Sequence, residues 1–150
     1  MVYFYFSKKI ALLVLTLSVG GILCGCDETG SGIPAQLQYY IAAQEALAGD
    51  DFAAAKKALQ SLSGHVEGAL QVEAKMAAGA VDIAALRAAF KPLSEGFAGM
   101  EIPPGYALAY CPMADDDRGA RWIQKKGEIA NPYFGSSMLI CGLFEDEKEP

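Results

Sequence analysis

Residues 82–97 read DIAALRAAFKPLSEGF, and this stretch decides the fold class. Its large apolar residues recur at alternating steps of three and four, which places them on one face of an α-helix. The seam that they form consists of Ile83, Leu86, Phe90, Leu93 and Phe97. Pro92 lacks a backbone N–H and predicts either a kink or a new helix start. The stretch therefore predicts an amphipathic helix that begins near Asp82 and packs onto a helical core.

Three further helices are predicted before this stretch. Apolar residues at helical spacing fill three segments, which are 34–48, 51–63 and 66–78. Nineteen alanines lie between Pro34 and Met100, so the helices can approach closely and the core is expected to be thin. Short loops favour antiparallel neighbours. We therefore expect a mainly α fold, with an antiparallel four-helix bundle over 34–100 and a small irregular or β cap over 101–142.

Composition and charge exclude several classes of protein. The chain has 150 residues, a formal charge of −6 and a hydrophobic share of 53%. A nucleic-acid binder would normally show a basic stripe, and a disordered chain would be far less apolar. Four cysteines and one histidine are too few for a dense disulfide scaffold or a His-rich metal site. The expected protein is a small acidic domain that does not bind nucleic acid.

The first 25 residues have the features of an export leader. Lys8 and Lys9 precede an apolar run over 10–24, and Leu23-Cys24-Gly25-Cys26 follows the pattern of a bacterial lipobox. We therefore expect lipidation of Cys26, a tether over 26–33 and a membrane-anchored protein that faces the periplasm. Asp27 resembles an inner-membrane retention signal. The alternatives are an uncleaved signal anchor and an ordinary secretory signal cut nearby.

Removal of this leader changes the charge of the part that folds. Residues 26–150 contain 10 basic and 18 acidic side chains, which gives a formal charge of −8. Acyl chains on Cys26 would supply a stable membrane anchor, because two or more chains hold where a single one does not. The membrane is thus the first expected partner.

The composition changes after residue 100. Aromatic residues, glycine and proline replace the alanines, and helix signals become weak. We expect short strands over 106–111 and 121–124 and an extended piece over 138–143. The domain boundary is expected after residue 142, so that residues 143–150 form an acidic tail.

Four sulfur-containing residues lie in this cap. Cys111 and Met113 are two apart, so on a strand they face the same way, and Met138 and Cys141 can do likewise on a turn. Two thiolates and two thioethers form a soft ligand set that suits Cu(I) or Ag(I). The alternative is a Cys111–Cys141 disulfide, as is usual for two cysteines in an exported protein, with the methionines as core filler. Free or reactive thiols are a third interpretation.

Other features of the chain point to structure more than to chemistry. Trp122 is expected to anchor the core of the cap, and Asp115-Asp116-Asp117 to be a solvated acidic loop. Lone His65 is expected at the surface. The sequence contains no Ser/His/Asp arrangement, no Gly-rich phosphate loop and no paired carboxylates with a reason to be catalytic. The expected protein is therefore not an enzyme.

The cap also resembles a known family through the string YCPMA over 110–114, GARWIQ over 119–124, IANPYFGSSM over 129–138 and Cys141-Gly142. It is similar to a bacterial domain family of unknown function, found in exported proteins and lipoproteins and appended to periplasmic adaptor subunits of copper and silver efflux pumps. The likeness spans about 36–142. It implies a four-helix domain with a small cap, a link to copper handling and an efflux adaptor as partner. The site residues that it implies are Cys111, Met113, Met138 and Cys141, supported by Trp122, Asn131 and Tyr133. The histidines that related sequences carry in the third and fourth helices are absent here.

Overall fold

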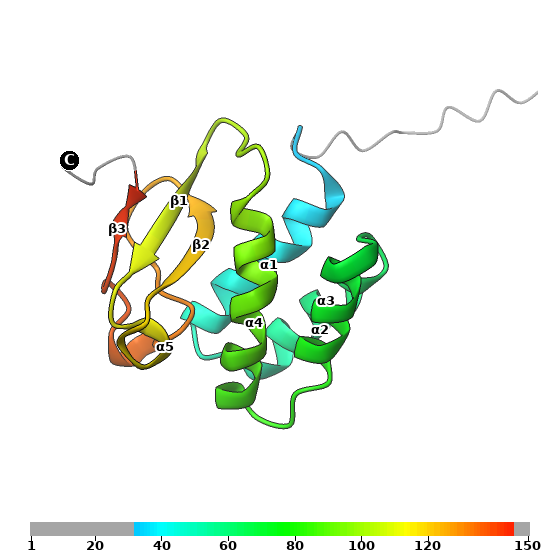
Figure 1. The fold of residues 1–150 in the computed structure, drawn as a ribbon, viewed down its shortest axis with the longest axis horizontal. Helices are drawn as coiled ribbons and strands as arrows, with labels where there is room; N and C mark the ends of the chain where they lie inside the picture. Colours follow the sequence, from blue (N-terminus) through cyan, green and yellow to red (C-terminus); the bar gives the residue numbers. More distant parts are fainter. Residues whose placement is uncertain (1–31, 146–150) are drawn as a thin grey trace, which may run out of the picture. The chain divides into compact units, whose positions relative to one another are not determined.

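The structure is a computed structural model, and it describes residues 32–145. It is mainly helical, with a small antiparallel sheet beside the helices (Figure 1). The four long helices are α1 (Ala35–Ala48), α2 (Phe52–Ser63), α3 (Gly68–Ala78) and α4 (Ile83–Ala98). The expectation of a mainly α fold with a small C-terminal cap is therefore confirmed. None of the helices in the described part of the chain is long and apolar enough to cross a membrane.

The helix ends follow from local chemistry. The Asp51 carboxylate accepts the Ala54 amide (2.9 Å) at the start of α2, and the Asp82 carboxylate accepts the Ala85 amide (2.8 Å) at the start of α4. α3 begins at Gly68, two residues later than expected. α4 runs through Pro92 as one helix, so Pro92 does not begin a new helix.

The apolar seam of α4 forms the centre of the helical core, as its spacing predicts. Its four deepest residues are at most 1% exposed, and they are Leu86, Phe90, Leu93 and Phe97. Tyr40 of α1 stacks on two of them, with ring centroids 5.4 Å from Phe90 and 4.4 Å from Phe97. These aromatic contacts tie the first helix to the last.

The sheet contains β1 (Tyr106–Cys111), β2 (Ala120–Lys125) and β3 (Leu143–Phe144), in the order β2-β1-β3. In its antiparallel register, Leu108 lies opposite Ile123 and Cys111 lies opposite Ala120. The first two strands are confirmed. The predicted extended piece over 138–143 is wrong except at its last residue, where β3 begins, because a bend and a turn over 138–140 follow the 3-10 turn η1 (Gly135–Ser137). The boundary after residue 142 is also wrong, since residues 143–144 pair with β1.

The helices and the cap share one core. Consecutive helices pack on each other, and β2 packs against both α1 and α4. Figure 1 shows α4 between the sheet and α3. Ile123 of β2 is 1% exposed and belongs to the helical core. Ile33, expected in the tether, also packs against this core, so the folded part begins before α1.

The outer edge of β2 is closed by side chains from the helices and the cap. The Ile123 amide donates to the Tyr40 hydroxyl (3.1 Å), which lies 2.5 Å from the Ser94 hydroxyl. The Arg121 carbonyl accepts from the Ser94 hydroxyl (2.9 Å) and from the Tyr133 hydroxyl (2.7 Å). These buried bonds satisfy backbone groups that point away from β1. They also fix how the cap sits on the helices.

The described residues, 32–145, belong to one compact unit. Cys26 and Asp27, on which the predicted lipid anchor and retention signal depend, lie outside the described residues, as do residues 146–150 of the expected tail. A chain that begins at residue 27 would retain all of the described contacts.

Candidate functional site

Two thiols from distant parts of the cap meet. Cys111, at the end of β1, is fully buried, and Cys141, between η1 and β3, is partly buried. Their Sγ atoms lie 3.0 Å apart, and both cysteines are free. This separation exceeds the length of a disulfide bond of about 2.05 Å and is short for two unbonded sulfurs. A small movement of one of the two cysteine-bearing segments would allow the thiols either to form a disulfide bond or to bind one shared metal ion.

A third sulfur reaches this pair. The Met113 Sδ atom lies 3.8 Å from Cys141 Sγ, and 48% of Met113 is exposed. Met138 belongs to the same neighbourhood, because its carbonyl oxygen accepts the Cys141 amide (3.1 Å) and its side chain lines a pocket together with Met113. The structure thus brings three of the four predicted sulfurs into direct contact and places the fourth on the wall of the adjoining pocket.

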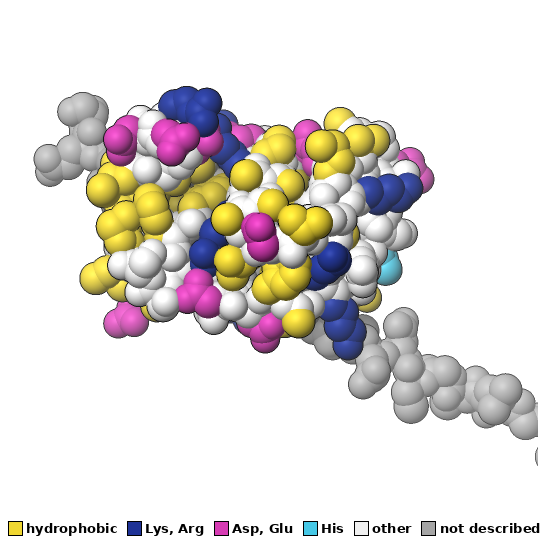
Figure 2. All heavy atoms as spheres, turned by 90° about the horizontal axis from the view of Figure 1, so that it is seen from below, with side chains coloured by type: hydrophobic (Ala, Val, Ile, Leu, Met, Phe, Trp, Pro, Cys, Tyr) yellow, Lys and Arg dark blue, Asp and Glu magenta, His cyan; other side chains and the backbone are white. Residues whose placement is uncertain are grey.

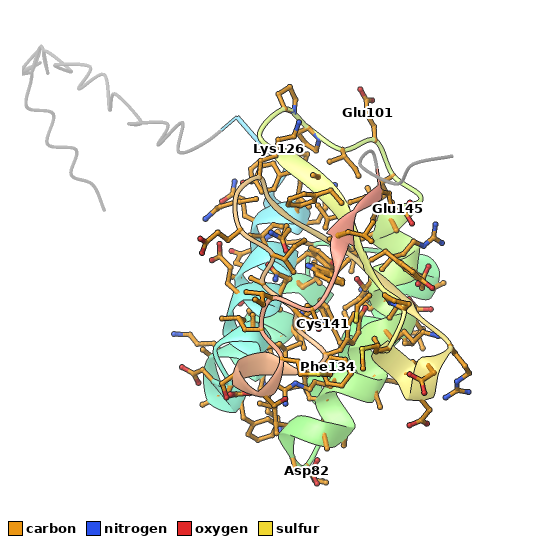
Figure 3. The ribbon with its side chains drawn as sticks, turned by 90° about the vertical axis from the view of Figure 1, so that its left-hand side faces the viewer. Asp82, Glu101, Lys126, Phe134, Cys141 and Glu145 are labelled. Atoms are coloured by element: carbon orange, nitrogen blue, oxygen red, sulfur yellow. The ribbon has the colours of Figure 1, made fainter. Side chains whose placement is uncertain are left out.

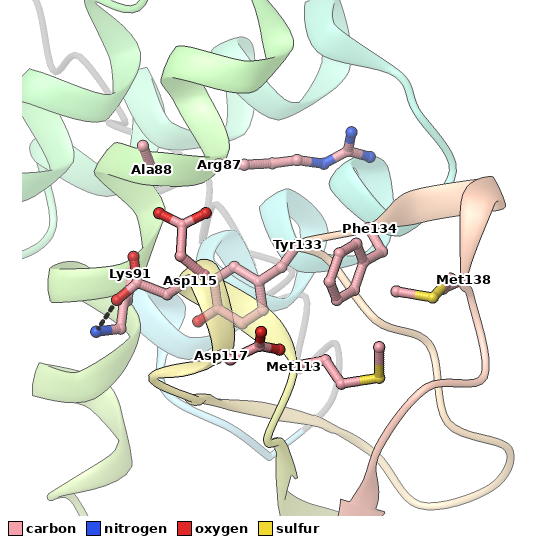
Figure 4. Close-up of a pocket in the computed structure, with 10 residues that line it drawn as sticks. Arg87, Ala88, Lys91, Met113, Asp115, Asp117, Tyr133, Phe134 and Met138 are labelled. Carbon is pink, nitrogen blue, oxygen red and sulfur yellow. Dashed lines mark ion pairs between the residues drawn. The ribbon is translucent and has the colours of Figure 1, made fainter.

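This pocket is open and has a volume of about 470 Å³. Figure 4 shows Met113 and Met138 on one side of it with Phe134 beside them, and Lys91 and Asp115 on the other. Lys91 Nζ lies 2.7 Å from an oxygen of Asp115. The pocket therefore combines two thioethers and an aromatic ring with charged side chains, since the same view shows Asp117 beside Met113 and the Arg87 guanidinium on the side of Phe134 and Met138.

Asp116 and Asp117 are exposed, as expected of a solvated acidic segment, whereas Asp115 is half-buried and engaged by basic side chains. Residues 114–117 form the short turn α5, in which Asp115, Asp116 and Asp117 all have positive φ angles (58°, 53° and 61°). Asp115 pairs with Lys91 and also with Arg118 (2.8 Å). These ion pairs lower the pKa of Asp115, with the Lys91 hydrogen bond as the main cause. The turn is a structured wall that positions Met113.

Asn131 holds the segment that carries Cys141. This fully buried side chain donates from Nδ2 to the Cys141 carbonyl (2.7 Å) and accepts at Oδ1 from the amides of Tyr133 (2.8 Å) and Phe134 (3.2 Å). Its own amide donates to the Leu139 carbonyl (2.7 Å). Asn131 therefore links the loop over 131–135 to the segment around Cys141. Figure 3 looks onto this side of the molecule and shows Cys141 close to Phe134.

Trp122 anchors the small core around Cys111, as predicted. It is fully buried and packs in one cluster with Cys111. Its indole N–H donates to the Gln124 side chain (2.9 Å), and its ring meets Tyr133 edge-on at 6.0 Å between centroids. Trp122 and Tyr133 thus form the floor beneath the thiols, which is a structural role.

The Cys141 thiol is a poor nucleophile in this arrangement. The hydrogen bond with Cys111, followed by burial, raises the pKa of the Cys141 thiol to about 11. A protonated thiol reacts slowly, and an ion that binds here must displace its proton.

The donor set limits which metal the site can take. Within residues 32–145, no group of three or more His, Cys, Asp or Glu side chains is placed to hold a metal ion. A metal at the thiol pair would therefore take its third ligand from a methionine. Thiolate and thioether together favour a soft monovalent ion over magnesium, calcium or manganese.

A junction below the site was not predicted. Asp50 has a left-handed backbone, with a φ of 59°. Its Oδ1 atom lies 2.5 Å from Arg87 Nη2. Its Oδ2 atom accepts hydrogen bonds from the Ser136 amide (3.1 Å) and from the Ser136 hydroxyl. Arg87 also donates to the carbonyls of Pro132 (2.9 Å) and Leu47 (2.8 Å). The junction fixes η1, and with it the start of the Met138 segment, on the ends of α1 and α4. Its members are up to 86 residues apart, so no local spacing signals it.

Comparisons with family models, with curated proteins and with solved structures return no match.

Proposed function

We propose that this protein is a membrane-tethered, extracytoplasmic binding module for Cu(I) or Ag(I), and that it has no catalytic activity. Cys111, Cys141 and Met113 would hold the ion, and Met138 would assist. The observation that carries this proposal is the convergence of three sulfurs, with distances of 3.0 Å between the thiols and 3.8 Å from Met113 Sδ to Cys141 Sγ. This set supplies the soft donors that a monovalent copper or silver ion prefers.

Binding would require a small opening of the thiol pair. With metal–thiolate bonds of about 2.3 Å, as for zinc, two thiolates in a trigonal site stand about 4 Å apart. The Sγ atoms are 3.0 Å apart, so one of them has to move by about 1 Å. Cys141 is the member that can move, because it lies in a turn while Cys111 lies within the sheet. Each bound thiol would release its proton to solvent.

The cellular setting of the proposal comes from the sequence. A lipid on Cys26 would tether the domain to a membrane facing the periplasm, with Asp27 favouring the inner membrane. The resemblance of the cap to domains on efflux adaptors suggests that the bound ion is buffered for, or passed to, such an adaptor in heavy-metal resistance. We also interpret α1–α4 as an antiparallel four-helix bundle, which is supported by the packing of consecutive helices across short loops.

The proposal is tested by titrating the fragment 27–150, fully reduced, with Cu(I) against a competing chelator. This fragment omits Cys24 and Cys26, whose thiols would bind copper themselves. We expect one tightly bound ion, with an affinity that falls at least tenfold in Met113→Leu, and we expect tight binding to be abolished in the double variant Cys111→Ser/Cys141→Ser. Met76→Leu is the matched control, since Met76 is 66% exposed on α3. An affinity that none of the sulfur substitutions changes would refute the proposal.

A second candidate function follows from the same 3.0 Å separation of the thiols. The pair would be joined as a disulfide, and the domain would act as a structural or interaction lipoprotein without metal. The bridge would close a loop of about 31 residues, worth roughly 3.5–4 kcal/mol in the chain-entropy model. Its formation would remove two hydrogen atoms, taken up by the oxidant of the compartment. Intact-mass analysis of exported protein, with and without reductant, separates the two functions.

A further inference from the structure

We propose that Met113 and Met138 form a second, outer site for Ag(I) or Cu(I) at the pocket, which captures the ion before the cysteine pair takes it. This inference rests on the proposed function, because it assigns a route to the same sulfur centre. It divides the four sulfurs into two pairs, an outer pair of thioethers and an inner pair of thiols. Met113 would bind the ion both during its capture at the outer site and after its transfer to the cysteines.

A gradient of exposure supports the division. Cys111 is fully buried, Cys141 is partly buried, and Met113 is 48% exposed. An ion arriving from solvent can therefore contact the Met113 thioether without first opening the protein. Because Met113 Sδ also lies 3.8 Å from Cys141 Sγ, the same sulfur can stay bound while a thiolate replaces the outer ligand.

The position of Met138 supplies the second ligand. Met113 precedes α5 and Met138 follows η1, and both side chains line the same open pocket of about 470 Å³. Figure 4 shows the two side chains on the same side of this pocket, next to Phe134. Two thioethers facing one solvent-filled space make a site that a soft ion can reach directly.

Both thioethers are held by structure that the helices provide. Lys91 of α4 pairs with Asp115 (2.7 Å) just after Met113, and Asp50 accepts the Ser136 amide (3.1 Å) just before Met138. The two ligand-bearing segments are therefore fixed on the same helical base. A site held in this way loses little conformational entropy when an ion binds.

The other pocket residues do not compete for such an ion. Asp115 is engaged by Lys91 and Arg118, and the carboxylates of Asp116 and Asp117 are hard donors that prefer hard cations. Arg87 and Lys91 carry positive charge. Two exposed large hydrophobic residues, Leu139 and Ile140, follow Met138 directly in the chain. Figure 2 shows hydrophobic side chains gathered at the sheet side of the molecule, beside an acidic and basic group.

The thioethers and the thiols differ in how they take up the ion. A thioether binds a soft cation without losing a proton, whereas each thiol has to release one. Capture by the methionines followed by transfer to the cysteines is then a ligand exchange. The thioether of Met138 leaves, the thiolates of Cys111 and Cys141 bind, and their protons pass to solvent.

The test uses Ag(I) and fragment 27–150 labelled with ¹³C at the methionine methyl groups. In the Cys111→Ser/Cys141→Ser variant, we expect Ag(I) to shift the methyl signals of Met113 and Met138 and to leave those of Met76 and Met100 in place. Met76 and Met100 are 66% and 41% exposed, so they control for silver binding to any exposed thioether. The further substitution Met138→Leu should weaken this residual binding at least tenfold.

Two outcomes would overturn the outer site. One is the absence of a shift at Met113 and Met138 in the cysteine-free variant, and the other is equal shifts at all four methionines. The same titration of the chain with intact cysteines distinguishes failure of the outer site from failure of the proposed function. If that chain takes up Ag(I) at its thiols while the methionine pair stays silent, the outer site alone fails. If its thiols take up no ion, the proposed function fails, whatever the methionines do.

A kinetic measurement gives a second check. With intact cysteines, Met138→Leu should slow the uptake of Ag(I) several-fold in stopped-flow mixing and leave the final occupancy unchanged, because the inner ligands remain. Met76→Leu should change neither quantity. An unchanged uptake rate in Met138→Leu would mean that the ion reaches the thiols by another path, which overturns the proposal.

Discussion

The side-chain amide of Asn131 donates a hydrogen bond to the carbonyl oxygen of Cys141, with 2.7 Å between the two atoms. Asn131 is fully buried, and its other side-chain atom, Oδ1, accepts two backbone amides. The position of one thiol in the site thus depends on a single amide group ten residues away.

Substitution Asn131→Ala should therefore lower the free energy of unfolding by about 3 kcal/mol or more. It leaves one carbonyl and two backbone amides without partners, and an unsatisfied buried group costs about 1–3 kcal/mol. Urea unfolding of fragment 27–150 measures the change. Gln38→Ala is the control, because the Gln38 amide bonds the Ile33 carbonyl (3.0 Å) on an exposed surface. Equal stability of the two variants would contradict the prediction.

The Tyr40 and Ser94 hydroxyls should show energetic coupling. They lie 2.5 Å apart in the buried contact between α1, α4 and β2, and each also bonds the backbone of β2. We expect Tyr40→Phe and Ser94→Ala each to cost about 1–3 kcal/mol, and the double variant to cost less than their sum by about 0.5–3 kcal/mol. Urea unfolding of the four chains measures this coupling. Strict additivity would mean that the two hydroxyls act independently.

Gly135→Ala should be much more damaging than Gly105→Ala. Both glycines have positive φ angles, 58° and 87°, so both substitutions impose backbone strain of about 1 kcal/mol. A Cβ at Gly105 meets nothing within 4 Å, whereas one at Gly135 would overlap Asp50 Oδ1 and Arg87 Nη2. The difference between the two melting temperatures therefore measures the contact with the junction. Similar melting temperatures would show that the junction can shift without cost.

Asp50→Asn should destabilise the protein at neutral pH and not at strongly acidic pH. The Ser136 hydroxyl and then Arg87 lower the pKa of Asp50 from 3.8 to about 2. A folded-state pKa below the unfolded value means that ionised Asp50 stabilises the fold above about pH 4, and that this contribution is lost as the pH falls toward 2. Asparagine tolerates the left-handed backbone that this position requires, so the charge is the main change.

The check is chemical unfolding of the wild type and Asp50→Asn between pH 7 and pH 2. The gap between their free energies of unfolding should be widest above pH 4 and should close on acidification. Glu67, exposed before α3, offers a control in Glu67→Gln. A gap that stays constant across the titration would show that the effect of Asp50→Asn does not come from its charge.

Local sequence patterns predicted the helices and the first two strands. The seam of α4 repeats with helical spacing within 15 residues, and residues 106–111 alternate between the two faces of β1. Such elements can be predicted from sequence, because burial of one face makes apolar residues recur at the spacing of a helix or a strand. Trp122 was also predicted as an anchor, since so large a side chain in a small cap has to be buried.

The features that were missed depend on contacts between distant residues. Strand β3 has only two residues, and pairing with β1 defines it more than any pattern of its own does. The left-handed backbone at Asp115 is held by Lys91, and that at Asp50 by Arg87 and Ser136, which are 37 and 86 residues away. Both main interpretations of the cap, the metal site and the disulfide, required Cys111 and Cys141 to meet, and the sequence did not decide between them. No spacing rule could have supplied the distance between the two thiols.

The closed edge of β2 also affects how copies of this protein meet one another. An outer strand normally presents unpaired amides and carbonyls on which a neighbouring chain can assemble, and this is a common start of aggregation. Here the Ile123 amide and the Arg121 amide and carbonyl are already bonded to Tyr40, Ser94, Tyr133 and Glu95. The backbone of a second molecule therefore cannot form hydrogen bonds with these three groups. Crowding of the protein should therefore not lead to fibre growth from this side of the sheet.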